Sequence, residues 1–293
     1  MAAKQLNLLP APTFSWLGVN GTEREIYDDV ANEITVSGCE DPVKRITVDA
    51  SANVKVSGSQ NPQLVVMHIN AEHAAVQTAV CAGAGETIKL VQIVSGGTNI
   101  LKLDAELADN ASLELVQIYL NTADAVSGSE IRMNGRKSVF TSYIGYNLTN
   151  DNTLDISLNI VQNGKKSESN TTVRGVLREH AKKIFRGTID FRNGAVGACG
   201  TEQENVLLLD ETVVNKTVPV ILCAEEDVAG SHGATIGQID PKHIFYMQSR
   251  GIPEAQIYEY LAQSQLGSIV RQIGDAETES GVSRMLGRET ADE

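Results

Sequence analysis

The segments Thr87-Ile-Lys-Leu-Val-Gln-Ile-Val94 and Leu113-Glu-Leu-Val-Gln-Ile-Tyr-Leu120 decide the fold class of this chain. In both, apolar residues alternate with polar ones, which is the pattern of a strand with one buried face. Turn-forming residues, Ser95-Gly96-Gly97 and Asp109-Asn110, lie between the two segments. This stretch therefore predicts short β-strands joined by tight turns.

The same pattern continues on both sides of this stretch. Further segments of this kind are 64–69, 139–144, 154–160, 184–191, 206–209 and 218–222, and Asn-Gly pairs mark turns at 134–135, 163–164 and 193–194. Successive main strands begin roughly 20 to 30 residues apart, which suits a coil with two or three strands per turn, as in a β-solenoid. A β-sandwich gives similar local patterns, so the pattern alone leaves both folds open.

Residues 1–20 are predicted to form an N-terminal arm in front of a β core spanning residues 21–240. Pro10 and Pro12 interrupt regular structure there, and the apolar residues available as anchors are Leu8, Leu9, Phe14, Trp16 and Leu17. Because large aromatic side chains are usually buried, we expect the arm to pack on the core and cover a sheet end. A contact with a partner protein is the alternative.

Residues 241–293 are predicted to form a helical segment with a mobile tail. Asp240-Pro241 is a helix-start signal, with Asp as the cap and Pro at the first helical position. A second helix begins near Pro253 and carries an apolar stripe through Ile257 and Leu261. From about Gly274 onward the apolar residues become sparse, which is typical of a mobile end.

The composition excludes several classes of protein. With 24 Lys and Arg against 37 Asp and Glu, the net charge of −13 argues against binding to nucleic acid or to an anionic membrane. No apolar run reaches the length of a membrane-spanning helix, and residues 1–10 do not resemble a secretion signal. The four cysteines, at 39, 81, 199 and 223, form no Cys-x-x-Cys pair, which favours free thiols in a cytoplasmic location.

The most distinctive chemistry follows the strand at Val220–Cys223. An acidic corner, Glu225-Glu226-Asp227, leads to a small-residue turn, Gly230-Ser231-His232-Gly233-Ala234-Thr235. Because its neighbours are small, His232 can face a partner or ligate a metal. A surface or hydrogen-bonded structural histidine is the alternative, and the local chemistry alone favours that alternative.

An ordered set of residues resembles the C-terminal signature of the SufB/SufD family of iron–sulfur cluster assembly proteins. This set is Ser231-His232-Gly233-Ala234-Thr235, Gly237, Asp240, Phe245-Tyr246 and Ser249-Arg250-Gly251-Ile252, with Arg174-Gly175, Phe185-Arg186-Gly187, Ile189 and Leu207-Leu208-Leu209 upstream. The resemblance implies a right-handed parallel β-helix core with helical ends. It therefore favours the solenoid over the sandwich.

Within that family the chain looks like a short form of SufD. Gly233 stands where SufB-type chains carry Glu, and Glu204 stands at about the position of the essential SufB cysteine. Gly230 replaces a cysteine that some SufD proteins carry two residues before the histidine. The chain also lacks much of the N-terminal helical region of SufD.

The resemblance implies a non-catalytic scaffold subunit that pairs with a SufB-like chain and docks a SufC-like ATPase. Iron or an iron–sulfur cluster would bind transiently at the subunit interface, and the candidate ligands are His232, Cys223 and Cys199. The residues expected to contact the ATPase are Phe245, Tyr246, Arg250, Ile257 and Leu261. The alternative for both cysteines is a role as small buried apolar residues.

Other functions stay open at this point. A SufB-type scaffold that holds a cluster itself is one, and a homodimer in place of a heterodimer is another. A carbohydrate-active β-helix enzyme would need paired carboxylates, for which Asp104 with Glu106 and Glu225 with Asp227 are candidates. The chain has no Walker phosphate loop and no Gly-x-Ser-x-Gly or His-Glu-x-x-His motif, so we expect no enzyme activity of those kinds.

Overall fold

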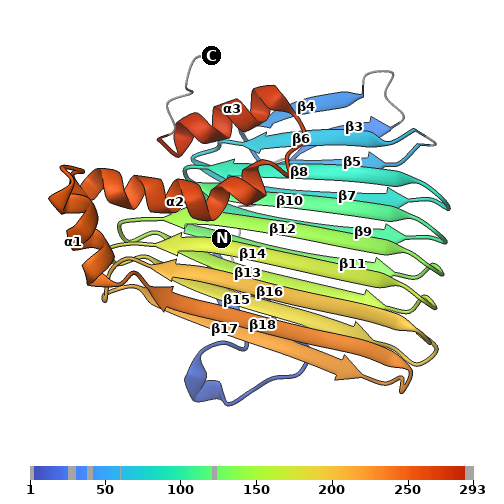
Figure 1. Ribbon diagram of the computed structural model, residues 1–293. Coiled ribbons are helices and arrows are strands. Elements are labelled where there is room, and N and C mark those ends of the chain that lie inside the picture. Colours follow the sequence, from blue (N-terminus) through green and yellow to red (C-terminus); the bar gives the residue numbers. More distant parts are fainter. Residues whose placement is uncertain (1–2, 26–30, 38–41, 60, 121–123, 288–293) are drawn as a thin grey trace.

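The computed structural model describes residues 3–25, 31–37, 42–59, 61–120 and 124–287. Within these ranges the chain forms two eight-stranded parallel sheets, followed by three helices (Figure 1). Consecutive strands alternate between the two sheets, so each turn of the chain adds one strand to each sheet. This arrangement confirms the predicted β-solenoid and excludes the sandwich, because every ladder between the solenoid strands is parallel.

The strands divide by number between the sheets. The even-numbered sheet contains β4 (Val43–Val48), β6 (Gln63–Ile69), β8 (Thr87–Ser95), β10 (Ser112–Leu120), β12 (Val139–Leu148), β14 (Glu168–Leu177), β16 (Ala198–Leu208) and β18 (Val228–Gln238). The odd-numbered sheet contains β3 (Asn32–Ser37), β5 (Ala52–Ser57), β7 (His73–Ala82), β9 (Thr98–Leu107), β11 (Asp124–Met133), β13 (Thr153–Gln162), β15 (Lys182–Phe191) and β17 (Val214–Cys223).

The eight predicted segments correspond to β6, β8, β10, β12, β13, β15, β16 and β17. The strands β7, β9, β11, β14 and β18 were not among them. Several of these strands are rich in small or polar residues, so their apolar alternation is weak. Their partners in the neighbouring coils, which lie far away in sequence, hold them in the ladder.

The interior consists mainly of columns of apolar side chains between the two sheets, with some buried polar side chains such as Gln92 and Gln117. Ile88, Leu113 and Phe140 are in register on β8, β10 and β12, and all three are fully buried. In a parallel in-register sheet, the side chain at one position of a coil lies directly over the side chain at the equivalent position of the next coil. Each column therefore continues the core from one coil to the next.

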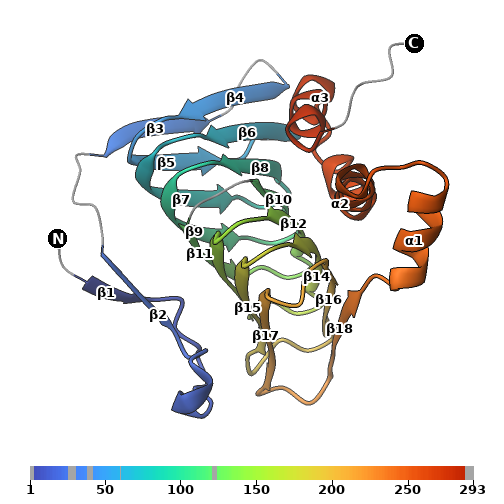
Figure 2. The same cartoon turned by 90° about the vertical axis from the view of Figure 1, so that its left-hand side faces the viewer.

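The three helices are α1 (Pro241–Ser249), α2 (Glu254–Val270) and α3 (Ala276–Met285). The helices α2 and α3 cover the outer face of the even-numbered sheet, whereas α1 has no buried residue and stands beside it (Figure 2). Val91 and Val116 on the outer face are fully buried and belong to one cluster with Ile269 of α2 and Val282 of α3. Burial on both faces explains why the segments at 87–94 and 113–120 are more apolar than a one-sided strand requires.

The helical segment begins where the sequence predicts. The Asp240 carboxylate accepts a hydrogen bond from the Lys242 backbone N–H at 2.9 Å and caps α1. The stretch beyond residue 274, predicted as a tail, contains α3, with Val282 and Leu286 buried. Residues 288–293 lie outside the described part of the chain. None of the described helices is both long and apolar enough to cross a membrane.

Two glycines allow the turns of neighbouring coils to stack closely. A Cβ atom on Gly164 would lie 1.8 Å from the carbonyl oxygen of Gly135, and one on Gly135 would lie 1.9 Å from the carbonyl carbon of Ala108. Any side chain at either position would therefore force adjacent coils apart. The Asn-Gly pairs at 134–135 and 163–164, which marked turns in the sequence, therefore also fix the close spacing of those turns.

The N-terminal arm is a separate antiparallel pair, β1 (Ala3–Leu6) with β2 (Thr22–Glu25), and the short helix η1 (Ser15–Leu17) lies between them. It packs against the outer face of the odd-numbered sheet, on the side opposite the helices (Figure 2). The Asn7 side chain donates to the Asp155 carboxylate at 2.6 Å, and Leu9 is buried. The arm therefore packs on the core as expected, but its described residues lie on the outer face of the odd-numbered sheet and do not cover a sheet end.

The prediction that aromatic side chains anchor the arm to the core is wrong. Phe14 and Trp16 are 74% and 79% exposed, so neither side chain packs on the core. A polar network attaches the arm instead: Arg186, itself fully buried, donates to the Val19 carbonyl and pairs with Asp155.

Candidate functional site

The end of the solenoid formed by β17 and β18 is open. Each of these strands pairs with a neighbour on one side within the described residues, β17 with β15 and β18 with β16. Every residue of β18 after Val228 is exposed, because no further coil lies over it. Unpaired backbone groups along such an edge can bind another strand.

His232 lies at the middle of this open edge. The segment 230–235, predicted as a turn, is part of β18, so the turn prediction is wrong. His232 pairs in register with Glu202 of β16, whose side chain points into the solenoid. Paired residues of adjacent strands project to the same face, so His232 points to the inner face of the last coil, where it is exposed.

Cys223 and Cys199 point to different faces. Cys223 is in register with the buried Phe191 and is exposed on the inner face of the last coil. Cys199 lies between the buried residues Ala198 and Gly200, so it points outward and is half-buried. Burial, together with the nearby charge of Glu168, raises the pKa of the Cys199 thiol. Cys81 is exposed on β7, and Cys39 lies outside the described residues.

These three candidate ligands do not meet within one chain. Gly230 of β18 faces Ile221 of β17 across the interior. The two strands run in opposite directions, so Cys223, two residues after Ile221, and His232, two residues after Gly230, lie on opposite sides of this contact. With a rise of about 3.3 Å per residue, the levels of Cys223 and His232 are about 13 Å apart along the strands. Among the described residues, no group of three or more His, Cys, Asp or Glu side chains could hold a metal ion.

A buried polar cluster lies one coil below His232. The Lys183 ammonium pairs with the Glu204 carboxylate, which also accepts hydrogen bonds from Thr217 at 2.6 Å and Tyr146 at 3.4 Å. Burial lowers the pKa of Lys183, although the charge of Glu204 opposes that effect. Glu204, a carboxylate in place of the thiol considered at about this position, is thus ion-paired in the interior.

Glu202 is the second carboxylate of this cluster. A Cβ atom on Gly187 would lie 1.7 Å from a Glu202 carboxylate oxygen, so the missing side chain of Gly187 makes the space that this carboxylate fills. Burial raises the pKa of Glu202 to about 7, and the charge of Glu204 adds to the rise while Lys183 opposes it. A carboxyl group that titrates near neutral pH therefore lies directly beneath the exposed His232.

No motif in the sequence singled out Lys183 or Glu202, and Glu204 stood out only as a position without a thiol. Residues 201–205 read Thr-Glu-Gln-Glu-Asn, which is polar on both faces. Alternation in this stretch cannot show which face is buried. The two glutamates at alternate positions were the available signal.

The candidate ATPase contacts divide into exposed and buried residues. On α1, Phe245 and Tyr246 are exposed, and the Arg250 guanidinium stacks on the Tyr246 ring with a centroid distance of 5.1 Å. Ile257 is fully buried, and Leu261 is partly buried in a cluster with Val176 of the sheet. Ile257 and Leu261 therefore hold α2 in place, and the accessible part of the set lies on α1.

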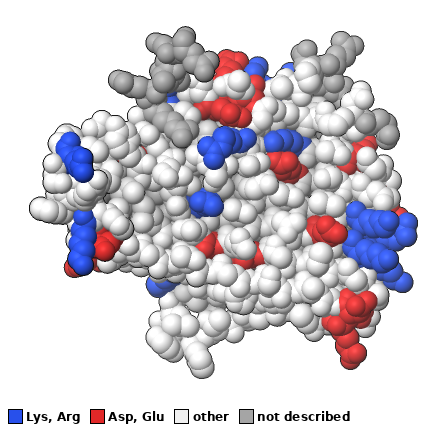
Figure 3. All heavy atoms as spheres, viewed as in Figure 1, with Lys and Arg blue, Asp and Glu red and all other residues white. Residues whose placement is uncertain are grey.

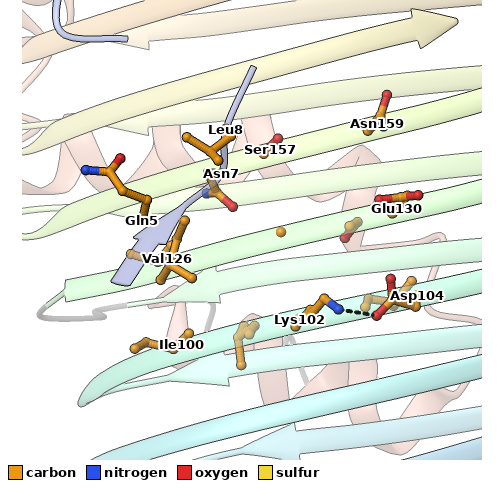
Figure 4. A pocket seen from close by; sticks show the side chains of 15 residues that line it. Gln5, Asn7, Leu8, Ile100, Lys102, Asp104, Val126, Glu130, Ser157 and Asn159 are labelled. Atoms are coloured by element: carbon orange, nitrogen blue, oxygen red, sulfur yellow. Dashed lines mark ion pairs between the residues drawn. The ribbon is translucent and has the colours of Figure 1, made fainter. Parts of the chain in front are cut away.

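Of the carboxylates considered for a carbohydrate site, Asp104 and Glu106 are paired with basic residues. A cavity of about 270 Å³ lies between the arm and strands β9, β11 and β13, and Lys102 and Asp104 line it (Figure 4). The Asp104 carboxylate lies 2.8 Å from Lys102, and that of Glu106 lies 3.8 Å from Arg132. Glu225 of the other pair accepts a backbone hydrogen bond from Gly194 at 2.9 Å.

Comparison with known proteins gives a family match over most of the chain. Residues 46–264 match the family described as "SUF system FeS cluster assembly, SufBD core domain". The SufD protein of Bacillus subtilis is 26% identical over 192 residues, which are 65% of this chain and 44% of that protein. The SufD protein of Escherichia coli is 26% identical over 113 residues, 39% of this chain and 27% of that protein. The matched regions thus span less than half the length of these relatives.

The raised pKa of Glu202 predicts a pH-dependent stability. Between about pH 4.5 and pH 7, an unfolded Glu202 ionises while the folded one keeps its proton, so the folded state loses stability as the pH rises. Replacing Glu202 with Gln removes this loss. The stability of Glu202→Gln relative to wild type should rise by about 3 kcal/mol between pH 4 and pH 8.

Urea unfolding at several pH values would measure this difference. Glu211→Gln, which changes an exposed carboxylate, is the matched control and should show little pH-dependent difference from wild type. The same stability difference for Glu202→Gln at pH 4 and at pH 8 would contradict the assignment.

Proposed function

This chain belongs to the SufBD core family of the SUF system for iron–sulfur cluster assembly, and we propose that it is a non-catalytic scaffold subunit of the SufD type. In this proposal it pairs with a SufB-like solenoid through its open end, docks a SufC-like ATPase on α1 and helps iron to enter. The observation that carries the proposal is the uncharged open edge of β18, with His232 at its centre.

The composition of β18 supports a docking role. Its eleven residues, Val228–Gln238, include no Asp, Glu, Lys or Arg, although the whole chain carries 61 such residues. Native proteins usually protect a free strand edge with charges, proline or a covering segment. The surface over β18 carries few charged side chains (Figure 3). An unprotected edge of this length favours pairing with a strand from another subunit.

The edge of the neighbouring strand β17 is less suited to pairing than that of β18. β17 contains Lys216 and Pro219. Proline lacks a backbone N–H, and a lysine charge is costly to bury between paired strands. A partner strand would therefore add to β18 in preference to β17.

The position of His232 supports a role for it in a shared site. Since His232, Cys223 and Cys199 do not meet within this chain, a complete ligand set for iron requires groups from the partner. The exposed imidazole lies on the face that a docked solenoid would cover. Iron or a cluster is the cargo of this site in the proposal, and it would bind transiently between the subunits.

The family match favours cluster assembly over a carbohydrate-active enzyme, and the ion pairs of Asp104 and Glu106 give that alternative no support. A SufB-type scaffold is also less well supported. Its cysteine position holds Glu204, which pairs with Lys183 in the interior. The SufD-type role is therefore the one we propose.

A charge on the β18 edge tests the pairing. Ile236 is 47% exposed at the open end, and Ile236→Lys would place an ammonium group in the proposed interface. We expect the affinity for a SufB-like subunit to fall by about tenfold or more, because that charge must be desolvated. Isothermal titration calorimetry with the purified subunits would measure the change.

The control is Met285→Lys, since Met285 is 44% exposed on α3 near the opposite end of the solenoid. Equal affinities for wild type and Ile236→Lys would contradict the proposed edge. A dimer of this chain alone that Ile236→Lys dissociates would identify a second copy as the partner.

Removal of the α1 aromatics tests the ATPase contact. The double substitution Phe245→Ala and Tyr246→Ala removes the two largest exposed apolar side chains of α1. Binding to a SufC-like ATPase should weaken about tenfold or more, as measured by surface plasmon resonance. Tyr260→Ala, on an exposed position of α2, should bind as wild type does. Loss of binding in the Tyr260 variant alone would place the contact on α2.

The ligand role of His232 predicts a defect in cargo loading without a defect in assembly. His232→Ala should lower the iron–sulfur content of the reconstituted complex several-fold while the subunits still co-elute from a sizing column. His180→Ala is the control, because His180 is exposed in a turn between β14 and β15. Unchanged iron and sulfide content in the His232 variant would reject the ligand role.

A further inference from the structure

The tip of the N-terminal arm presents two exposed aromatic side chains. Phe14 is the N-cap residue of η1 and Trp16 lies within it, and each has more than seven-tenths of its surface exposed. Trp16 is the single tryptophan of the chain. Side chains of this size are seldom left in water unless they meet a partner.

The tip is held in one conformation. The Asn20 side chain accepts a hydrogen bond from the Thr13 backbone N–H at 2.7 Å and donates one to the Thr13 carbonyl at 2.9 Å, which closes the loop. Gly18 ends η1 in the left-handed conformation, with φ of 61°. The aromatic side chains therefore project from a preorganised loop, which lowers the entropy cost of binding.

The tip is also fixed to the last strands of the solenoid. The Lys216 ammonium of β17 donates to the Leu17 carbonyl at 3.0 Å, and Arg186 of β15 donates to the Val19 carbonyl. Figure 1 shows the tip projecting past β17 at the open end, and Figure 2 shows that it stands on the β17 side of that end. The aromatic side chains thus flank the surface on which a second solenoid would dock.

We propose that the arm tip is a clamp that grips the solenoid subunit docked on β18, with Phe14 and Trp16 inserted against apolar side chains of its last coil. This inference rests on the proposed pairing through the open end. β18 would supply the backbone ladder, and the arm would supply the aromatic anchors on the side where Pro219 and Lys216 prevent strand addition at β17. The occupant is therefore the same partner solenoid that pairs with β18.

The clamp should act mainly on the lifetime of the complex. Buried aromatic anchors dominate the energy of many interfaces, and interface substitutions change dissociation rates more than association rates. We expect the double variant Phe14→Ser and Trp16→Ser to dissociate from the SufB-like subunit about tenfold faster than wild type. Surface plasmon resonance with the full-length chains would measure both rates.

Leu8→Ser is the matched control, because Leu8 is 61% exposed on the same arm but lies over the middle of the odd-numbered sheet (Figure 4). It should dissociate as wild type does. A second measurement needs no substitution in the arm: 5-fluorotryptophan in this chain gives one ¹⁹F resonance, from Trp16, which should shift when the unlabelled partner is added.

The outcomes separate the clamp from the pairing. If wild type forms no complex with the partner, both proposals are overturned. If the complex forms and Ile236→Lys disrupts it, but the arm variant dissociates at the wild-type rate and the ¹⁹F resonance does not move, the clamp alone is overturned. A shifted resonance together with faster dissociation of the arm variant supports the clamp.

Discussion

In-register parallel pairing between successive coils is the constraint on which this structure depends. Each coil satisfies the backbone hydrogen bonds of the coil before it and exposes a fresh row of its own, so the stack cannot end without leaving an edge. The columns of buried side chains obey the same rule, as Ile88, Leu113 and Phe140 illustrate. The proposed docking surface follows from this constraint, because β18 is a strand at which the ladder stops.

The interior changes character as it approaches that edge. Through the middle coils it is mostly apolar, with uncharged polar side chains such as Gln92 and Gln117 hydrogen-bonded to each other. One coil below β18, by contrast, it contains Lys183, Glu202 and Glu204. Burying these charges is tolerable because Glu204 pairs with Lys183 and because Glu202 can keep its proton near neutral pH. The open end thus combines the uncharged strand edge of β18 with the buried carboxyl group of Glu202, which titrates near neutral pH. A docked subunit would cover both.

The segments outside the solenoid divide the two outer faces between them. The helices α2 and α3 bury the outer face of the even-numbered sheet through apolar contacts, whereas the arm attaches to the odd-numbered sheet through the polar network of Asn7, Asp155 and Arg186. Apolar packing leaves the aromatic residues of α1 at the edge of one face, and the polar attachment leaves Phe14 and Trp16 exposed at the edge of the other. Both sets of exposed aromatics therefore stand at the borders of the molecule, where partners can reach them.

The sequence alone determined the strand class, the Asn-Gly turns, the start of α1 at Asp240-Pro241 and the resemblance to SufB and SufD, because local alternation and turn chemistry encode these features. It did not determine that residues 230–235 continue a strand, that Trp16 is exposed, or that Cys199 points away from His232. Nor could the polar stretch 201–205 show that Glu202 and Glu204 face inward. These features depend on which residue of one coil lies over which residue of the next, and that register is set by contacts between positions far apart in the chain.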